Sequence, residues 1–337
     1  MNGIYAIIVT YGNRWKYLKE VVFSALEEGV DQIIIIDNNS NINTRNNLKL
    51  LENKNENRVR VIYLDKNFGS AGGFFKGLET AYNEKKCKFI WLLDDDNRPK
   101  RGSLNALIDT WHKHRLNEEE KFALLSIRKN IINITQNTSE NFISFGIGRK
   151  NSFVYLDIRE IPKKILRYFK RSVYFKAKSQ NQRNNVIDFD IKIKVAPYGG
   201  LFFEKAVIDK IGLPNTEYFT YLDDFDWTWR LTKYYGNIYL VPESEIEDIE
   251  KSWNINKKST FHAMRKEDDF RIYYFLRNRI YFESKIFNIN SNIYKINKFI
   301  FILISKVFLS KKKYKIVKRA IEDGENGIMG TCREISI

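Results

Sequence analysis

Residues 91–99 read WLLDDDNRP, an apolar run that ends in the consecutive carboxylates Asp94, Asp95 and Asp96. Residues 88–93 are typical of a strand that is buried on both faces of a parallel sheet. Three adjacent negative charges repel one another, so a fold accepts them most readily where a cation offsets them. We therefore expect a strand that carries these carboxylates from the core to the edge of a sheet, where they bind a cation.

Strand and helix signals alternate through the first part of the chain. Short apolar runs rich in β-branched residues predict strands over 4–10, 32–37, 58–64 and 88–93. Apolar residues from Leu18 to Leu26 recur at helical spacing, and a second helix follows the glycine-rich turn at 67–73. This alternation predicts an α/β fold with a parallel sheet and helices on both faces.

Polar residues follow each predicted strand. In parallel sheets, ligands bind beyond the carboxyl ends of the strands. That rule brings to one edge Thr10 and Tyr11, Asp37, the turn at 67–73, and Asp94 with its two neighbours. Convergence of these endings is more informative than any one of them, and it predicts a ligand site at this edge.

Asp94 and Asp96 have the spacing of a cation site. Divalent cations such as Mg²⁺ and Mn²⁺ prefer oxygen ligands, and two carboxylates one residue apart on a turn can face the same ion. An ion held there would keep open positions for phosphate oxygens and stabilise a leaving diphosphate. A solvated acidic turn is the alternative, but the apolar strand before the turn argues against it.

A second carboxylate cluster comprises Asp223, Asp224 and Asp226, where we expect a helix to begin near residue 223. Capping of a helix N-terminus accounts for one or two of them. A carboxylate that deprotonates a hydroxyl would account for another. The turn GSAGG (69–73) could bring backbone amides close to an anion, although a simple tight turn explains it as well.

Composition restricts the partner and the compartment. Lys and Arg number 57 against 41 Asp and Glu, a net charge of +16 that favours an anionic partner: nucleic acid, lipid headgroups or a phosphorylated substrate. Cys87 and Cys332 form neither a disulfide framework nor a zinc cluster, which suits the cytoplasm. The apolar run at the N-terminus is too short for a signal peptide.

The run FIFILISKVFL (299–309) is about half the length of a membrane-spanning helix, and KKKYK follows it shortly afterwards. It predicts either a helix that lies on a membrane surface with its lysines facing anionic lipid, or a buried C-terminal helix with a solvated basic end. The sequence leaves both interpretations open.

The domain organisation follows from these patterns. We expect one α/β domain over 1–283, with a nucleotide-binding half at 1–100 and an acceptor-side half at 101–283. A basic insertion at 150–195 interrupts the second half. Residues 284–337 form a C-terminal helical appendage.

In this order, IVTYGNR, IIIIDNNS, DKNFGSAGGFFKG, WLLDDDNRP and YLDDFDWTWR resemble the motifs of the inverting GT-A glycosyltransferases of family 2. The resemblance covers roughly residues 3–283. Within the family, the pattern is most similar to bacterial galactofuranosyltransferases, both in the turn at 67–74 and in a His after an aromatic residue, His262, before YYFLRNR (273–279). Rhamnosyltransferases look similar, so the donor sugar stays open.

The resemblance implies roles for particular residues. The nucleotide base and ribose would be held by Thr10, Tyr11, Arg14 and Asp37. The diphosphate and sugar would lie along Asn67, Gly72, Gly73 and Lys76. Asp94 and Asp96 would bind Mn²⁺ or Mg²⁺ with His262 as a third ligand, and Asp95 would contact the donor.

The same resemblance makes Asp224 the general base, with Asp223 orienting the acceptor. Asp224 would take the proton of the acceptor hydroxyl as its oxygen attacks the anomeric carbon, so the anomeric configuration inverts. Two details depart from the family pattern: Gly12 intervenes before Asn13, and Leu222 stands where galactofuranosyltransferases carry Trp. The insertion at 150–195 has no counterpart there.

We therefore predict a glycosyltransferase that builds a capsule or another surface glycan on a lipid-linked acceptor, at the cytoplasmic face of the inner membrane. UDP-galactofuranose is the expected donor, and dTDP-rhamnose is the alternative. A sugar-phosphate nucleotidyltransferase would carry a glycine-rich basic loop after the first strand, which residues 10–13 match poorly. A nucleic-acid binding protein would leave both acidic clusters unexplained, so we expect no nucleic-acid partner.

Overall fold

The computed structural model describes residues 1–115, 120–128, 142–143, 147, 149–160, 191–250, 260–286, 291–332 and 334–335. The chain divides into two compact units. The first comprises Met1–Phe145 and Phe189–Lys257, and the second comprises Gly146–Asp188 and Lys258–Ile337. Each unit is described by itself.

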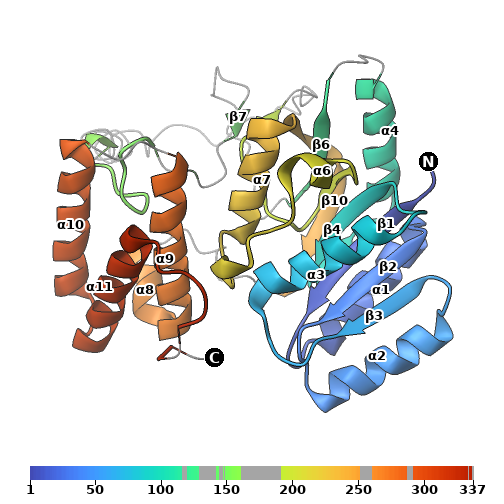
Figure 1. The fold of residues 1–337 in the computed structure, drawn as a ribbon, viewed down its shortest axis with the longest axis horizontal. Coiled ribbons are helices and arrows are strands. Elements are labelled where there is room, and N and C mark those ends of the chain that lie inside the picture. The colour runs from blue at the N-terminus through green and yellow to red at the C-terminus, as the bar shows by residue number, and fades with distance from the viewer. Residues whose placement is uncertain are drawn as a thin grey trace, which may run out of the picture. The chain divides into compact units, whose positions relative to one another are not determined.

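The first unit contains a mixed sheet with the strand order β3-β2-β1-β4-β9-β6-β10-β8-β7. Its parallel part consists of β1 (Ile4–Thr10), β2 (Gln32–Asp37), β3 (Val59–Tyr63) and β4 (Phe89–Asp94). These strands confirm the predicted ones to within a residue at each end. In Figure 1 they lie side by side. β4 is apolar up to its last residue, Asp94.

The remaining strands are β5 (Asn97–Pro99), β6 (Phe122–Ile127), β7 (Phe142–Ile143), β8 (Lys192–Ile193), β9 (Leu201–Glu204) and β10 (Asn237–Asp248). β9 runs antiparallel between β4 and β6. β10 extends well beyond the predicted strand at 237–242, and its end pairs with β5, Asp248 opposite Asn97. The residues directly after the acidic turn, which form β5, are therefore paired with the end of β10.

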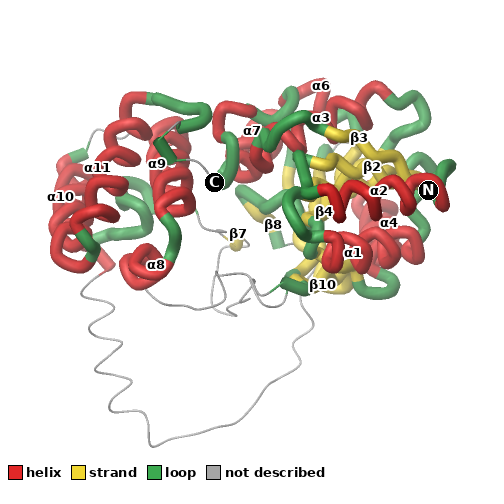
Figure 2. Tube along the Cα trace, turned by 90° about the horizontal axis from the view of Figure 1, so that it is seen from below, coloured by secondary structure: helices red, strands yellow, loops and turns green. Residues whose placement is uncertain are grey.

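Helices cover both faces of this sheet: α1 (Trp15–Glu28), α2 (Ile42–Lys54), α3 (Gly69–Asn83), α4 (Ser103–Arg115), α6 (Val207–Ile211) and α7 (Asp223–Tyr234). Side chains alternate along β1, so Ile7 and Val9 pack with α3, α6 and α7, whereas Ala6 and Ile8 pack with α1, α2 and α4. Figure 2 shows the strands between these two helical layers. The α/β prediction is confirmed.

Gly73 sets the close approach of α3 to β1. A Cβ atom at this position would lie 2.4 Å from Cγ1 of Val9, and one at Gly77 would lie 2.4 Å from Cγ2 of Ile7. Larger residues would push the helix off the sheet. The glycines of α3 therefore hold its N-terminus at the edge of the sheet where β1 ends.

The second unit contains the 3₁₀ turn η1 (Ile158–Glu160) and the helices α8 (Thr260–Lys266), α9 (Asp269–Ile286), α10 (Asn292–Phe308) and α11 (Lys311–Asn326). α9 packs along α11, and α10 packs on α8 and α11. For this reason the boundary between units follows Lys257, rather than residue 283 as the sequence suggested. No helix in the described ranges is long and apolar enough to cross a membrane.

Candidate active site

The acidic turn between β4 and β5 is held by Asn97. The Asn97 Nδ2 donates to Asp248 Oδ1 at 2.8 Å and to Asp96 Oδ1 at 3.2 Å. Asn97 is 1% exposed, so its hydrogen bonds, and not water, hold the turn in place. The end of β10 and the turn after β4 thus form one rigid polar edge.

Arg14, at the start of α1, neutralises two of the three carboxylates in this turn. Its Nε lies 2.8 Å from both carboxylate oxygens of Asp95, and its Nη2 lies 3.2 Å from Asp96 Oδ2. Thr10 Oγ1 donates to Asp95 Oδ2 at 2.7 Å. Arg14 also pairs with Glu250. Thr10 and Arg14 were predicted to hold the nucleotide; in the structure they hold Asp95, and their contact with a nucleotide stays a prediction.

Asp248 is a functional candidate that the sequence analysis missed. Its side chain is 4% exposed, and its Oδ1 lies 3.3 Å from Arg128 Nη1, which in turn is 3.8 Å from Asp94 Oδ2. Among the described residues, Asp248 Oδ2 is buried and accepts no hydrogen bond. A buried carboxylate oxygen without a partner is costly, and a cation relieves that cost. The apolar–polar alternation that continues through Ile246 could have extended the predicted strand to Asp248.

Gly199 lets the backbone before β9 approach the acidic turn closely. A Cβ atom at Gly199 would lie 1.9 Å from Asn97 Oδ1 and 2.7 Å from Asp94 Oδ2. A glycine inside a strand signal often marks close approach of a backbone or a ligand, and the Gly199–Gly200 pair in PYGGLFF carried that signal unused. Here the missing side chain lets the Gly199 backbone pack directly against the side chains of Asn97 and Asp94.

The electrostatics of the turn favour a bound cation. Burial raises the pKa of Asp94, and the Arg128 charge only partly opposes this. Burial raises the pKa of Asp95 to about 6 even though Arg14 and Thr10 lower it. Burial, followed by the charges of Asp94 and Asp95, raises the pKa of Asp96 to about 7. More positive charge than Arg14 and Arg128 provide would stabilise the ionised turn.

The donor atoms therefore suit a hard divalent cation, with oxygens from Asp94, Asp96 and Asp248. In the described ranges no group of three or more His, Cys, Asp or Glu side chains already has the arrangement of a metal site. The Arg128 guanidinium contacts both Asp94 and Asp248 and so occupies the position between these two carboxylates. His262, the predicted third ligand, lies in α8 of the second unit, and its role as a ligand stays a prediction.

The end of β2 and the turn before α3 are joined by hydrogen bonds. Asn38 Nδ2 donates to Asn67 Oδ1 at 3.0 Å and to the Gly69 carbonyl at 2.8 Å. Asp37 accepts from the backbone N–H of Ser40 at 2.8 Å and from Arg45 Nε at 2.6 Å. This edge is preformed, as a nucleotide site needs to be.

The other residues predicted to contact the sugar-nucleotide donor differ in exposure and in the contacts that they make. Tyr11 is 47% exposed at the end of β1. Gly72 lies within α3, where a Cβ would meet Phe68 Cβ at 2.4 Å, so helix packing accounts for this glycine as it does for Gly73. Lys76 Nζ pairs with Glu79 at 2.7 Å. Their contacts with diphosphate or sugar stay predictions.

Asp223 and Asp224 begin α7, as predicted. Asp223 is 2% exposed and accepts from Ser70 Oγ at 3.0 Å; burial and the neighbouring Asp224 charge raise its pKa well above the usual range. Burial raises the pKa of Asp224 to about 7, opposed by the Phe225 N–H and reinforced by the Asp94 charge. The influence of Asp94 places the two acidic clusters in one electrostatic site.

Asp226 has a different role from its neighbours. Its Oδ2 lies 3.1 Å from Arg230 Nε, and its Oδ1 accepts from the Tyr218 hydroxyl at 3.2 Å. This carboxylate stabilises α7 and the turn before it. The structure therefore separates the cluster into a structural member and two members with raised pKa values.

The segment that presents these carboxylates is strained. Phe219, Tyr221 and Leu222 have φ values of 63°, 65° and 61°, a left-handed conformation that bulky residues rarely adopt. The Phe219 carbonyl accepts from the Ala71 N–H at 3.1 Å, which fastens this segment to the start of α3. Backbone strain of this kind concentrates at functional sites.

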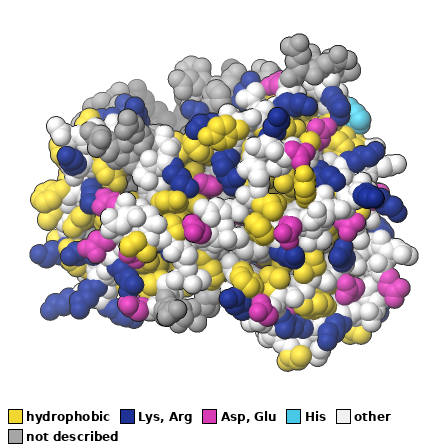
Figure 3. All heavy atoms as spheres, in the orientation of Figure 1, with side chains coloured by type: hydrophobic (Ala, Val, Ile, Leu, Met, Phe, Trp, Pro, Cys, Tyr) yellow, Lys and Arg dark blue, Asp and Glu magenta, His cyan; other side chains and the backbone are white. Residues whose placement is uncertain are grey.

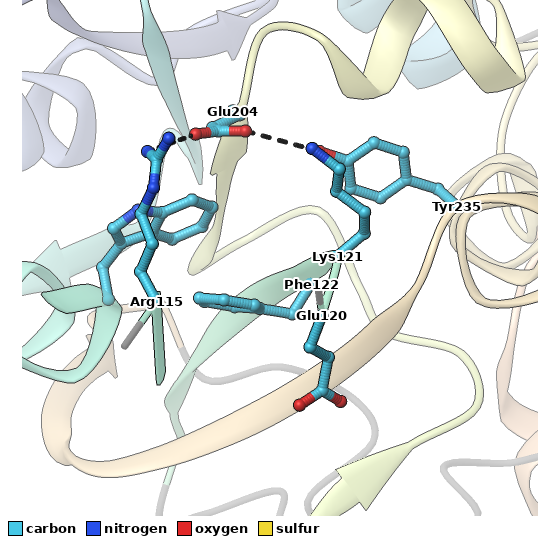
Figure 4. Close-up of a pocket in the computed structure, with 7 residues that line it drawn as sticks. Arg115, Glu120, Lys121, Phe122, Glu204 and Tyr235 are labelled. Atoms are coloured by element: carbon cyan, nitrogen blue, oxygen red, sulfur yellow. Dashed lines mark hydrogen bonds and ion pairs between the residues drawn. The ribbon is translucent and has the colours of Figure 1, made fainter. Parts of the chain in front are cut away.

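Figure 4 shows a separate pocket in the same unit, lined by Trp111, Arg115, Glu120, Lys121, Phe122, Glu204 and Tyr235. Glu204 pairs with Phe89, the first residue of β4, so this pocket lies at the opposite edge of the sheet from Asp94. An ion pair of 3.0 Å between Arg115 and Glu204 spans it. It takes no part in the acidic site.

Residues 5–206 match the family described as Glycosyl transferase family 2. The chain belongs to that family. It has a GT-A-like fold, a central sheet flanked by helices. The predicted membership of family 2 is thereby confirmed. The match does not show which sugar is transferred, so galactofuranosyl specificity stays a prediction.

Known proteins with detectable similarity are distant. The putative teichuronic acid biosynthesis glycosyltransferase TuaG of Bacillus subtilis (strain 168) is 29% identical over 106 residues, which are 31% of this chain and 40% of TuaG. The structure of S. aureus TarS has a TM-score of 0.50 at 11% identity, over 99% of this chain and 50% of TarS. GalNAc-T7 with UDP, GalNAc and Mn²⁺ has a TM-score of 0.51 at 15% identity, over 97% and 57%. The chain thus spans well under two thirds of each.

Proposed function

We propose that this glycosyltransferase transfers a sugar, with inversion, from a nucleoside-diphosphate donor to a hydroxyl of a glycan acceptor. The observation that carries the proposal is the placement of two carboxylate clusters: Asp94 and Asp96 at the end of β4, and Asp223 and Asp224 at the start of α7. Ser70 Oγ of α3 contacts Asp223 at 3.0 Å. One cluster has the oxygen donors for a diphosphate-bound cation. The other has a carboxylate tuned to accept a proton near neutral pH.

Asp224 acts as the general base. A carboxylate whose pKa lies near 7 is a stronger base than an exposed one and is still ionised in part at neutral pH. It removes the proton of the acceptor hydroxyl while that oxygen bonds to the anomeric carbon and the bond to the diphosphate breaks. Asp223, fixed by Ser70 Oγ, orients the acceptor.

Asp94, Asp96 and Asp248 hold the cation that such donors require, Mn²⁺ or Mg²⁺. When bound, the ion supplies positive charge for the leaving diphosphate. The Asp248 Oδ2 atom, which is buried and has no hydrogen-bond partner among the described residues, supports this assignment. His262 remains a proposed additional ligand. Asp95 accepts hydrogen bonds from Arg14 and Thr10 and so stabilises the turn. Its contact with the sugar donor remains a proposal.

The donor we propose is a UDP-sugar, with UDP-galactofuranose first and dTDP-rhamnose as the alternative. The base and ribose would lie along Tyr11, Asp37 and Asn67. A UDP-bound protein of like fold, GalNAc-T7, supports the nucleotide but not the sugar. For the acceptor, the name of TuaG, a putative teichuronic acid glycosyltransferase, supports a cell-surface polysaccharide. We propose that this acceptor is lipid-linked.

The test is a calorimetric titration of the purified chain with UDP, with and without Mn²⁺, repeated with dTDP. Binding of UDP that requires Mn²⁺ is the expected result. Preference for dTDP would retain the site and change the donor to a dTDP-sugar such as rhamnose. Absence of binding to either nucleotide would overturn the proposed donor site. Retention on DNA that weakens with salt, without nucleotide binding, would favour the nucleic-acid alternative.

A further inference from the structure

Helix α10 packs with one face inside the second unit and exposes an apolar face on the opposite side. The inner face is buried: Tyr294, Asn297, Phe301 and Ser305 pack within the second unit, and the rings of Tyr294 and Phe301 lie 5.4 and 5.2 Å from that of Phe153. The outer face, called here the α10 face, consists of Ile296, Phe299, Leu303, Val307 and Phe308. These five side chains are 45–79% exposed.

Such a helix is unusual in water. A surface helix normally presents a polar outer face, whereas the exposed side of α10 carries a stripe of large apolar side chains. Positions 296, 299, 303 and 307 follow one another at helical spacing, so their side chains form a continuous stripe rather than scattered contacts. The α10 face therefore requires a partner that accepts apolar side chains.

Basic side chains border this stripe. Lys306 lies in the last turn of α10, and α11 begins two residues after Leu309 with Lys311 and Lys312. Lys306, Lys311 and Lys315 are exposed and form no ion pair with any other described residue. Figure 3 shows apolar side chains at the edge of the molecule over α10, with Lys and Arg gathered next to them.

Neighbouring lysines are already engaged within the unit. Lys312 pairs with Asp269 at 2.6 Å, and Lys313 donates to the backbone carbonyls of Met264 and Arg265 at 3.0 and 2.8 Å. These contacts fix the start of α11 against α8. The backbone that carries Lys311 and Lys315 is therefore fixed, and these two side chains are exposed.

We propose that the α10 face, with Lys306, Lys311 and Lys315, binds the surface of an anionic lipid bilayer. Apolar side chains enter the boundary of the acyl chains while lysines contact the headgroups, as in helices that lie in a membrane interface. A second copy of the chain fits less well, because it would bring two chains of net charge +16 together at their basic edges. The helix lies on the bilayer and does not cross it.

This inference does not depend on the donor nucleotide. It adds a location to the proposed function, since an enzyme held on the bilayer meets a lipid-linked acceptor in two dimensions. It also distinguishes between the two interpretations of 299–309 that the sequence left open. The helix is packed on its inner face and still presents a second apolar face to lipid.

The experiment is co-sedimentation of the full chain with vesicles of phosphatidylcholine, with and without phosphatidylglycerol. We expect binding that requires the anionic lipid and weakens with salt. The variants Phe299→Ser/Leu303→Ser and Lys311→Glu/Lys315→Glu should each weaken binding about tenfold or more. The matched controls are Ile42→Ser/Leu50→Ser and Lys49→Glu on α2, whose side chains are also exposed; they should bind as the unmodified chain does.

Three results would overturn the inference: no sedimentation of the unmodified chain, equal loss in the α2 controls, or full binding by both α10 and α11 variants. A dimer in solution that the Phe299→Ser/Leu303→Ser variant abolishes, without lipid binding, would assign the face to a second copy. UDP titration of the same preparations separates the two proposals. Nucleotide binding without vesicle binding rejects only the membrane face, and the reverse rejects only the proposed function.

Discussion

The Arg14 Nε atom lies 2.8 Å from both carboxylate oxygens of Asp95, joining the start of α1 to the turn after β4. The two residues are 81 positions apart in the chain. The Arg14 side chain is 15% exposed and that of Asp95 is 6% exposed, so little water competes for either charge. This pair lets the turn keep Asp94 and Asp96 as carboxylates available to a ligand.

Replacing Arg14 should therefore lower the free energy of unfolding, apart from any effect on catalysis. Arg14→Ala leaves Asp95 buried without its counter-ion, and we expect a loss of about 2–4 kcal/mol in the free energy of unfolding. Denaturant unfolding measures this. In Arg14→Ala/Asp95→Asn the uncompensated charge is gone, so the double variant should regain part of the loss. A double variant less stable than Arg14→Ala would contradict the pairing.

The parallel half of the sheet could be predicted because each strand is a short apolar run and each connection has helical spacing. Residues 4–10 and 32–37 became β1 and β2 without change. Local pattern suffices there, since these strands are buried on both faces. The acidic end of β4 was found because charges that follow an apolar strand are conspicuous, and the acidic start of α7 because carboxylates are typical of a helix N-terminus.

Other parts of the site depend on contacts that a linear pattern does not contain. Asp248 joins the site because β10 pairs with β5, and Gly199 matters because its Cα faces Asn97 and Asp94. The left-handed conformation of Tyr221 and Leu222 has no residue signature, as neither is glycine. The insertion predicted at 150–195 lies largely outside the described residues, at 161–190.

Asp224→Asn should abolish transfer and retain UDP binding within about threefold, because it removes a base and not a ligand. The same change should raise the melting temperature above pH 7. Burial raises the folded pKa of Asp224 to about 7, so the folded chain loses stability as pH rises from the unfolded pKa of about 4 towards 7. The asparagine carries no such charge.

Activity assays, calorimetry and thermal melting of Asp224→Asn test these three expectations together. Asp226→Asn is the matched control: it removes a carboxylate two residues along α7 that pairs with Arg230, so it should lower the melting temperature and retain measurable transfer. Full transfer by Asp224→Asn would reject the assignment of the base.

The pH dependence of kcat/KM should follow the same carboxylate. Asp224 must be ionised to accept the proton, so activity should rise with pH and level off above about pH 7. Below that, it should fall about tenfold for each pH unit. Because Asp223 and Asp224 are neighbours, the profile reports the pair rather than one residue. A profile that stays flat between about pH 5.5 and 8.5 would exclude this base.

Two residues are candidates for the third metal ligand: Asp248, which the structure suggests, and His262, which was predicted from the sequence. Asp248→Asn should weaken binding of Mn²⁺, followed by electron paramagnetic resonance without nucleotide, by about tenfold or more. Glu247→Gln is the control, since Glu247 pairs with Arg98 at 2.8 Å, and it should leave binding unchanged. His262→Ala should weaken Mn²⁺ and UDP binding together if His262 is also a ligand. Loss in His262→Ala with none in Asp248→Asn would return the site to the predicted set of Asp94, Asp96 and His262.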